Sequence, residues 1–523
     1  MALPLIAVVY LSLMPEDSLW QHLFDTILPI YALNTVILMV GTAGSVFVLG
    51  TGSAWLVTAY NLPGRKFLQW GLLLPFAMPS YVVAFVYTEF YEFSGPIQTM
   101  IRYVFGYTNR TDYYFPEIRS LGGAIFILSI VLYPYVYMLA RASFSQQSVT
   151  ILETGRVLGR SPWQCFCALA LPLSRPAIVT GIMLVMMETL NDFGTVSLFG
   201  VHTLTSGIYD IWLGMNDVGS AAQIAVMMLI IVFGLLYIEM RARKSNLAFS
   251  SNTLQRTAKL LTLSKGNVIF ACIFCYGLIL IGFIIPAGIL VDYSIRFFDV
   301  AYTDKFLSYS FNSLMMALIS AFIVMVIGIF LAYGLRLNKS RFNTFMVRIS
   351  CLGYATPGAV LAIGVLIPLA WFDNTVDGIM RSQLDISTGL LLSGGMFILI
   401  YAYTVRFVNI GFGASESALM RITNNMDSAG RVFGQSPLGV LGHIHLPIMK
   451  SGILAGAIIV FVDTMKELSS TLLLRPFNFE TLATYVYQFA SDELIEQASL
   501  GALVIVATGI IPVIVLSLII NKK

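Results

Sequence analysis

Charged and amide side chains interrupt two otherwise apolar runs of the sequence. They are Glu188, Asn191 and Asp192 in the run 176–200, and Asp463, Lys466 and Glu467 in the run 451–474. Groups of this kind can attract a cation or pair with one another. They are costly in hydrocarbon, so they normally face a bundle interior or a water-filled cavity. The acids in each run are four residues apart, a spacing that places both on one face of a continuous helix.

Two interpretations of these residues remain open. In the first, the two acidic faces meet on a shared axis and form a polar collar around a path for a cation. In the second they form a structural network, in which Lys466 neutralises a neighbouring acid. The second interpretation needs no passing ion.

Catalytic chemistry finds little support in the sequence. No G-x-x-x-x-G-K-[ST] loop is present, and no lysine directly follows a glycine. A phosphate cradle of that type is therefore absent, and any ATP hydrolysis must occur on a partner. His443 and His445 are two residues apart, so they do not share a helix face, and no third metal ligand is evident. We expect no catalytic residue, metal or cofactor in this chain.

The composition indicates that the protein lies in a membrane. Hydrophobic residues make up 58% of the 523 residues and charged residues 11%, against about 25% in ordinary soluble domains. This predicts an all-α polytopic membrane protein. The net charge of +3 is small and dispersed, which argues against a nucleic-acid partner.

Eleven apolar runs are long enough to cross a bilayer. They lie near 33–58, 67–90, 121–140, 176–200, 219–240, 268–294, 311–335, 345–371, 388–408, 451–474 and 499–520. A twelfth, Met1–Met14, is apolar but short, so it is either a shortened first span or part of a longer one. We expect about twelve transmembrane helices. Basic residues concentrate in alternate connections, Arg406 being counted among them, which predicts that both termini are cytoplasmic.

The chain is a tandem repeat. Asn34 and Asn312 are 278 positions apart, as are Pro79 and Pro357, and a later offset of 275 aligns 155–162 with 430–437. Each half then holds six spans in the same orientation. We predict a first repeat over 1–240, a basic cytoplasmic linker over 241–267 and a second repeat over 268–523.

Two long cytoplasmic loops, 141–175 and 409–450, carry the most distinctive pattern. Each has a helical stretch, a glycine, Ser-Pro and a second stretch that ends in Leu-Pro. Glycine permits a tight reversal, and proline suits the first turn of a helix. The residues singled out are Glu153, Gly155, Leu158, Gly159, Ser161, Leu171 and Pro172 in the first loop, and Ser428, Gly430, Phe433, Gly434, Ser436, Leu446 and Pro447 in the second.

This pattern resembles the E-A-A-x-x-x-G loop of permease subunits of binding-protein-dependent ABC importers. Thr154-Gly155 replaces Ala-Ala in the first loop, and Ser428 replaces the acid in the second, where Asp427 comes one position early. The segments Met187–Val196 and Met465–Leu468 resemble corresponding segments of the fused two-domain permeases of iron(III) importers. The resemblance covers nearly the whole chain.

The resemblance implies a type I importer permease in the bacterial inner membrane. It also implies two copies of an ATPase subunit that carry ATP and Mg²⁺, each docking one loop, and a periplasmic protein that delivers ferric iron. The same kind of permease for thiamine or a phosphonate remains an alternative. A 6+6 secondary transporter is a further one, although such a protein would not be expected to carry the paired loops.

The periplasmic stretch 87–119 is rich in tyrosine and acids. Phenolate and carboxylate oxygens would suit a ferric ion, whereas tyrosines are also common where helices leave a bilayer. We favour an interfacial belt or a docking surface over contact with the substrate.

Overall fold

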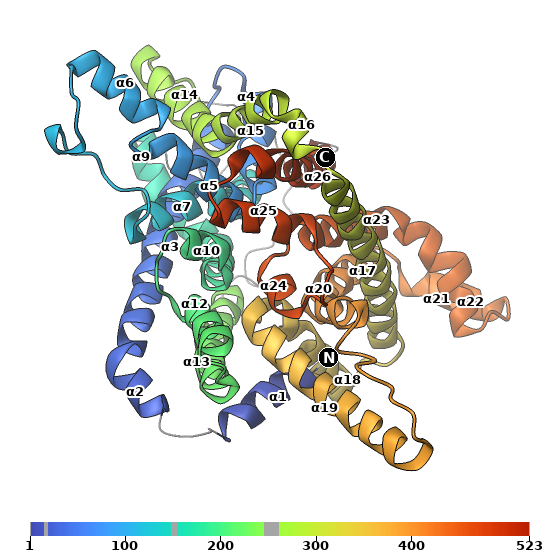
Figure 1. Cartoon of the computed structure of the whole chain (residues 1–523). Coiled ribbons are helices and arrows are strands. Elements are labelled where there is room, and N and C mark those ends of the chain that lie inside the picture. The colour runs from blue at the N-terminus through green and yellow to red at the C-terminus, as the bar shows by residue number, and fades with distance from the viewer. Residues whose placement is uncertain (1, 15–18, 148–154, 156, 245–260, 522–523) are drawn as a thin grey trace. The chain divides into compact units, whose positions relative to one another are not determined.

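The computed structural model describes residues 2–14, 19–147, 155, 157–244 and 261–521 (Figure 1). In these ranges all regular structure is helical, apart from one isolated bridge between Tyr60 and Leu261. The expected all-α class is confirmed. The linker predicted over 241–267 lies mostly outside the described residues.

Ten described helices are long and apolar enough to cross a membrane. They are Leu28–Ala59, Leu121–Ser145, Pro162–Asn191, Val218–Ala242, Lys265–Arg296, Asp304–Leu337, Gly358–Leu384, Met396–Leu419, Pro437–Met465 and Ile495–Pro512. A helix pair, 65–77 with 80–105, bends by 89° and would supply one more. The predicted first span is the ten-residue helix Leu3–Ser12, which is shorter than a bilayer requires.

The chain forms two compact units. We call residues 21–207, 228–298 and 489–523 the N-unit, and residues 1–20, 208–227 and 299–488 the C-unit. Each unit takes most of its residues from one sequence repeat and borrows segments from the other. The boundaries of the two units therefore differ from the boundaries of the two sequence repeats.

The N-unit contains most helices of the first repeat together with the first and last helices of the second. They are α2 (Leu19–Thr26), α3 (Leu28–Ala59), α4 (Arg65–Gly71), η1 (Leu74–Ala77), α5 (Ser80–Tyr91), α6 (Pro96–Phe105), η2 (Arg110–Asp112), α7 (Leu121–Gln146), α9 (Pro162–Cys165), η3 (Phe166–Ala170), α10 (Leu171–Asn191), α11 (Gly194–Leu198), α14 (Lys265–Ile279), η5 (Leu280–Ile284), α15 (Ile285–Arg296) and α26 (Ile495–Asn521). Helix α12 (Leu204–Tyr209) and helix α13 (Val218–Lys244) divide between the units, and one end of α2, of α16 (Phe298–Ala301) and of α25 (Leu482–Ser491) also crosses a unit boundary.

The C-unit contains α1 and most of the second repeat. Its elements are α1 (Leu3–Ser12), η4 (Asp210–Gly214), α16 (Phe298–Ala301), α17 (Asp304–Leu337), α18 (Arg341–Ser350), η6 (Cys351–Ala355), α19 (Gly358–Leu384), α20 (Met396–Leu419), α21 (Asn424–Val432), α22 (Pro437–Val440), η7 (Leu441–His445), α23 (Leu446–Met465), α24 (Ser469–Leu474) and α25 (Leu482–Ser491).

The exchanged helices pack closely against the repeat that receives them. In the C-unit, α1 lies on α19, where a Cβ added to Gly364 would come within 2.2 Å of the Pro4 carbonyl oxygen. In the N-unit, α26 lies on η1, where a Cβ added to Gly509 would come within 2.4 Å of the Ala77 carbonyl oxygen. Glycine is thus required at both approaches for a steric reason.

The predicted span over 345–371 has different bounds. The amphipathic helix α18 and the short η6 occupy its first part, and the long helix begins only at Gly358 and runs to Leu384. Pro357 explains the break, because its backbone is extended and a helix cannot continue through it. The next residue, Gly358, starts the new helix.

Candidate functional site

The first arm of each long loop ends at a glycine with a positive φ. We call residues 141–175 loop 1, in the N-unit, and residues 409–450 loop 2, in the C-unit. Gly159 has φ +80° and Gly434 has φ +73°. Both values lie in the left-handed region that glycine tolerates and most other residues avoid. The amide after each glycine closes the helix end, with N–H···O distances of 3.1 Å from Arg160 to Gly155 and 3.0 Å from Gln435 to Gly430.

The other glycine of each motif lets two arms of a hairpin touch. Gly155 and Gly430 are buried, and a Cβ added to Gly155 would lie 2.8 Å from the Leu169 side chain. The same atom on Gly430 would lie 2.9 Å from the Ile444 side chain. This match shows why glycine stands where the related motif has alanine.

Ser161 and Ser436 start the second arm of each loop, as predicted. The Ser161 hydroxyl accepts a hydrogen bond from the Gln164 amide at 3.2 Å, and the Ser436 hydroxyl accepts one from the Gly439 amide at 3.2 Å. Each serine precedes a proline at the first helical position, whose missing N–H costs nothing there.

The second arm does not end at Leu-Pro, contrary to expectation. A five-residue π turn, η3 in loop 1 and η7 in loop 2, precedes Leu171-Pro172 and Leu446-Pro447, and the helix then continues into a span. Proline cannot donate the usual backbone hydrogen bond. The wider turn lets the chain accommodate it without stopping.

The hairpin tips expose apolar side chains at matching positions of the two loops. Their exposed fractions are 86% for Val157, 74% for Leu158 and 68% for Trp163, against 84% for Val432, 83% for Phe433 and 67% for Leu438. Each residue of the second loop is 275 positions after its counterpart. Exposed apolar patches of this kind mark contact surfaces.

Loop 1 is anchored by aromatic packing. Trp55 from α3 is 6% exposed, and its ring centroid lies 5.0 Å from Phe166 and 5.4 Å from Phe144. The Gln147 amide nitrogen donates to the Ala170 carbonyl at 2.9 Å. Glu153, predicted to contribute here, lies outside the described residues.

Loop 2 is anchored by charge. Asp427 accepts from Arg336 Nε at 2.8 Å and contacts His445 Nε2 at 2.6 Å. Partial burial alone would raise the pKa of Asp427, but hydrogen bonds from Arg336 and His445 hold that pKa below its ordinary value. His445 is fully buried and Ser428 is exposed. The acid one position early therefore forms the ion pair, and His445 belongs to the same network.

The carboxylate of Asp192 caps the helix that follows it. Asp192 Oδ1 accepts from the Thr195 amide at 2.9 Å, and Asp192 Oδ2 accepts from the Thr195 hydroxyl at 3.1 Å and from the Ser80 hydroxyl. Helix α10 ends at Asn191, and Asp192 has an extended backbone. The prediction that Glu188 and Asp192 share one helical face is therefore wrong, because a capping residue leaves the helix.

The second repeat builds the same cap with an added cation. Helix α23 ends at Met465, so Asp463 and Glu467 do not share a helical face either. Glu467 Oε1 accepts from the Ser470 amide at 3.1 Å, and Glu467 Oε2 lies 3.2 Å from Arg406 Nε. Arg406 is 6% exposed within α20. Counting it as a loop residue was wrong; its position inside an apolar run was the signal for this pair.

The remaining polar residues of the two runs are partly exposed. Lys466 Nζ lies 2.9 Å from Asp463 Oδ1, which is the neutralising contact that the structural interpretation required. Glu188 and Asn191 lie in the last turn of α10 and are each half-buried. The described residues contain no group of three or more His, Cys, Asp and Glu that could hold a metal ion.

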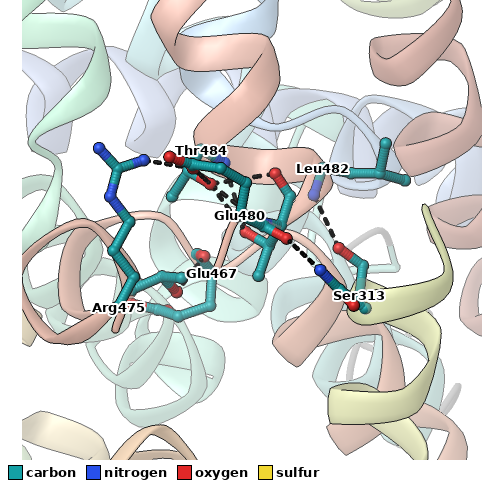
Figure 2. Close-up of polar contacts among 9 residues, drawn as sticks. Ser313, Glu467, Arg475, Glu480, Leu482 and Thr484 are labelled. Atoms are coloured by element: carbon teal, nitrogen blue, oxygen red, sulfur yellow. Dashed lines mark hydrogen bonds and ion pairs between the residues drawn. The ribbon is translucent and has the colours of Figure 1, made fainter. Parts of the chain in front are cut away.

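The first turn of α25 is tied to α17 (Figure 2). The Leu482 amide donates to the Ser313 hydroxyl at 2.7 Å, the Thr484 hydroxyl donates to Glu480 Oε2 at 2.6 Å, and Arg475 pairs with Glu480. The first repeat has the equivalent tie, from the Leu204 amide to the Thr35 hydroxyl at 2.9 Å. Sequence reasoning missed these residues, because single hydroxyls in apolar runs are common.

The described residues form a polytopic helical fold with matched loops and polar breaks in the candidate spans, features that suit a membrane transport protein. Residues 46–243 match the family described as binding-protein-dependent transport system inner membrane component. This match and the relatives below support a fused two-domain permease of this importer class, and the candidate spans support a multi-pass membrane protein.

Several relatives are permeases. The chain is 24% identical to the Fe(3+)-transport system permease protein FbpB 2 of Haemophilus influenzae over 92% of this chain and 88% of that protein. It is 22% identical to the ferric transport system permease protein FbpB of Actinobacillus pleuropneumoniae, over 80% of this chain and 61% of that protein. The sulfate transport system permease protein CysW of Escherichia coli is 30% identical over 29% of this chain and 49% of its own length.

Proposed function

We propose that this chain is the permease of an ATP-driven importer for ferric iron in the bacterial inner membrane, with both termini cytoplasmic. The observation that supports ATP coupling best is the matched pair of loops. Both have a positive-φ glycine, a serine-capped second arm and exposed apolar residues at the same three positions. One loop could be exposed by chance, whereas two in register fit two identical partners.

The partners of these loops are two copies of an ATPase subunit, which would carry ATP and Mg²⁺. Leu158 and Phe433 supply the central apolar contacts, since both are exposed next to the glycine that ends the first arm. One fused chain would then bind two ATPase copies. The two complexes would differ in strength because their anchors differ.

Co-purification tests this coupling. The variants L158D and F433D, separately and together, should lower ATPase recovery, and the double variant should lose both copies in native mass spectrometry. F342D is a matched control, because Phe342 is 67% exposed on α18 and outside both loops. Full ATPase binding by the double variant, or two permease chains per complex, would contradict the proposal.

Ferric iron is supported as substrate by the iron-transport relatives that align with most of the chain. A periplasmic binding protein would deliver it, in keeping with the description of the matching family. Uptake of radiolabelled iron by cells that depend on this importer tests the substrate. We expect iron uptake that requires the chain, an ATPase and a delivery protein. Transport of thiamine or a phosphonate without iron uptake would contradict the assignment of ferric iron as the substrate.

An oxyanion such as sulfate is the second candidate substrate. The similarity to the sulfate permease favours it. Competition separates the two substrates. If ferric iron is the substrate, excess sulfate should leave iron uptake unchanged. Sulfate uptake that depends on this chain and that excess iron does not inhibit would favour the oxyanion.

The polar residues of the two breaks would line the path. Asp192 and Glu467 act there mainly as caps, whereas the half-buried Glu188, Asn191, Asp463 and Lys466 are the better candidates for contact with substrate. The variants E188Q and D463N should reduce uptake with the ATPase complex intact. Normal uptake by the double variant would show that Glu188 and Asp463 do not line the path. D192N retains a capping oxygen, whereas E467Q leaves Arg406 without its carboxylate and should impair assembly instead.

A further inference from the structure

Helix α6 turns the Gln98 side chain toward the protein and a set of apolar side chains outward. Met100, Tyr103, Val104 and Phe105 are exposed at 67%, 90%, 60% and 67%. Met100, Tyr103 and Val104 share one face at the spacing i, i+3, i+4. In a protein surrounded only by water this orientation would be unfavourable.

The inward polar groups are used by the N-unit itself. The Gln98 side chain is buried, donates to the Tyr91 carbonyl at 2.7 Å and accepts from the Tyr113 hydroxyl at 2.7 Å. Arg102 donates to the Phe93 carbonyl at 2.6 Å, and its guanidinium carbon lies 3.9 Å from the centre of the Phe93 ring. These contacts fix the rotation of α6, so its apolar face points away from the unit for a structural reason.

Helix α6 is the last part of a candidate membrane segment. A buried glycine, Gly95, folds the chain back onto the end of α5, where an added Cβ would meet the Glu89 and Phe90 carbonyl oxygens at 2.5 and 2.8 Å. The residues 80–105 belong to the bent helix pair that could cross the bilayer. Helix α5 is buried along residues 81–88, so α6 is the part of this candidate segment that exposes a continuous apolar face.

We propose that α6 lies along the membrane interface and inserts the side chains of Met100, Tyr103 and Val104 among the acyl chains and headgroups of the outer leaflet. An amphipathic helix with aromatic and aliphatic residues on its outer face binds a bilayer surface in this way. The outer face carries no charge, whereas a docking surface for a soluble protein would normally include charged or hydrogen-bonding groups at its rim. The inference is independent of the substrate of the importer.

Hydroxyl-radical footprinting of the unmodified chain in lipid nanodiscs tests this proposal. Tyr103 and Tyr114 form a matched native pair, since they are 90% and 92% exposed on the protein alone. Tyr114 lies among the charged residues Arg110, Asp112 and Glu117, which keep its segment in water. We expect Tyr103 to be oxidised at least fivefold more slowly than Tyr114 in nanodiscs.

Equal oxidation rates for the two tyrosines in nanodiscs would overturn the proposal. It would also be overturned if Tyr103 became protected only after the delivery protein was added, because α6 would then be a protein docking surface. A second measurement uses nitroxide labels at V104C and T111C, with the unsubstituted chain as background for its native cysteines. Oxygen should relax the label at 104 more than a water-soluble nickel complex does, and the order should reverse at 111.

Discussion

The described parts of loop 1 and loop 2 share a turn and a cap but are held to the spans by different chemistry. At corresponding positions, 278 residues apart, Trp55 packs on aromatic rings, whereas Tyr333 donates its hydroxyl to the Pro437 carbonyl at 2.6 Å and faces His445. Aromatic packing depends on buried area, and the Asp427 network depends on charge. The conserved geometry of the two tips therefore does not require a conserved anchor.

The largest expected effect is on loop 1. Replacing Trp55 by alanine should cost about 3–5 kcal/mol, because a large buried side chain would leave a cavity between α3 and the loop. Hydrogen exchange should rise in residues 157–170 and stay unchanged in loop 2. W55F is the control, since a smaller ring retains much of the contact. Equal exchange in both loops would show that the anchors are not independent.

Removing the charge of loop 2 should have a somewhat smaller effect. D427A leaves Arg336 and His445 without their shared carboxylate and should cost about 2–3 kcal/mol, below the range for fully buried pairs because the groups are slightly exposed. Hydrogen exchange should rise in α21. High salt should weaken loop 2 of the unmodified chain in the same direction and leave loop 1 unaffected; insensitivity of α21 to both changes would contradict a charge-based anchor.

Acid should separate the two loops without any substitution. The folded pKa of Asp427 is lowered, so its contribution to stability is present above the ordinary carboxyl value of about 4 and is lost as the pH falls through the folded pKa. Exchange in α21 should increase below about pH 4, after correction for the intrinsic rate. The described anchor of loop 1, made of Trp55, Phe144 and Phe166, has no titratable group and should not respond.

The smallest effects should be equal in the two loops. G159A and G434A each place a side chain at positive φ and should cost about 1 kcal/mol. Thermal unfolding of each single variant measures this loss. G442A is the control within loop 2, because Gly442 has no positive φ and open space around it. A loss confined to one loop would indicate that the tips differ as well as the anchors.

The sequence by itself predicted the features that depend on near neighbours. Apolar runs of sufficient length revealed the spans, and the order of Gly, Ser and Pro predicted the turn and cap of each loop. These features follow from residues within a few positions of one another, since hydrophobic periodicity, capping and positive φ are local properties. The repeat was also visible in the sequence, because the same local patterns recur 275 to 278 positions later.

Only the tertiary structure decided which distant groups meet. Arg406 joins Glu467 across 61 positions, and Asp427 selects Arg336 across 91, whereas several other cations and acids in the sequence were equally available. The exchange of α1 onto α19 and the end of α10 before Asp192 were likewise decided by packing and capping in the folded chain. A buried charge takes the partner that the packed helices bring within a few ångströms, and a single sequence contains no record of that distance.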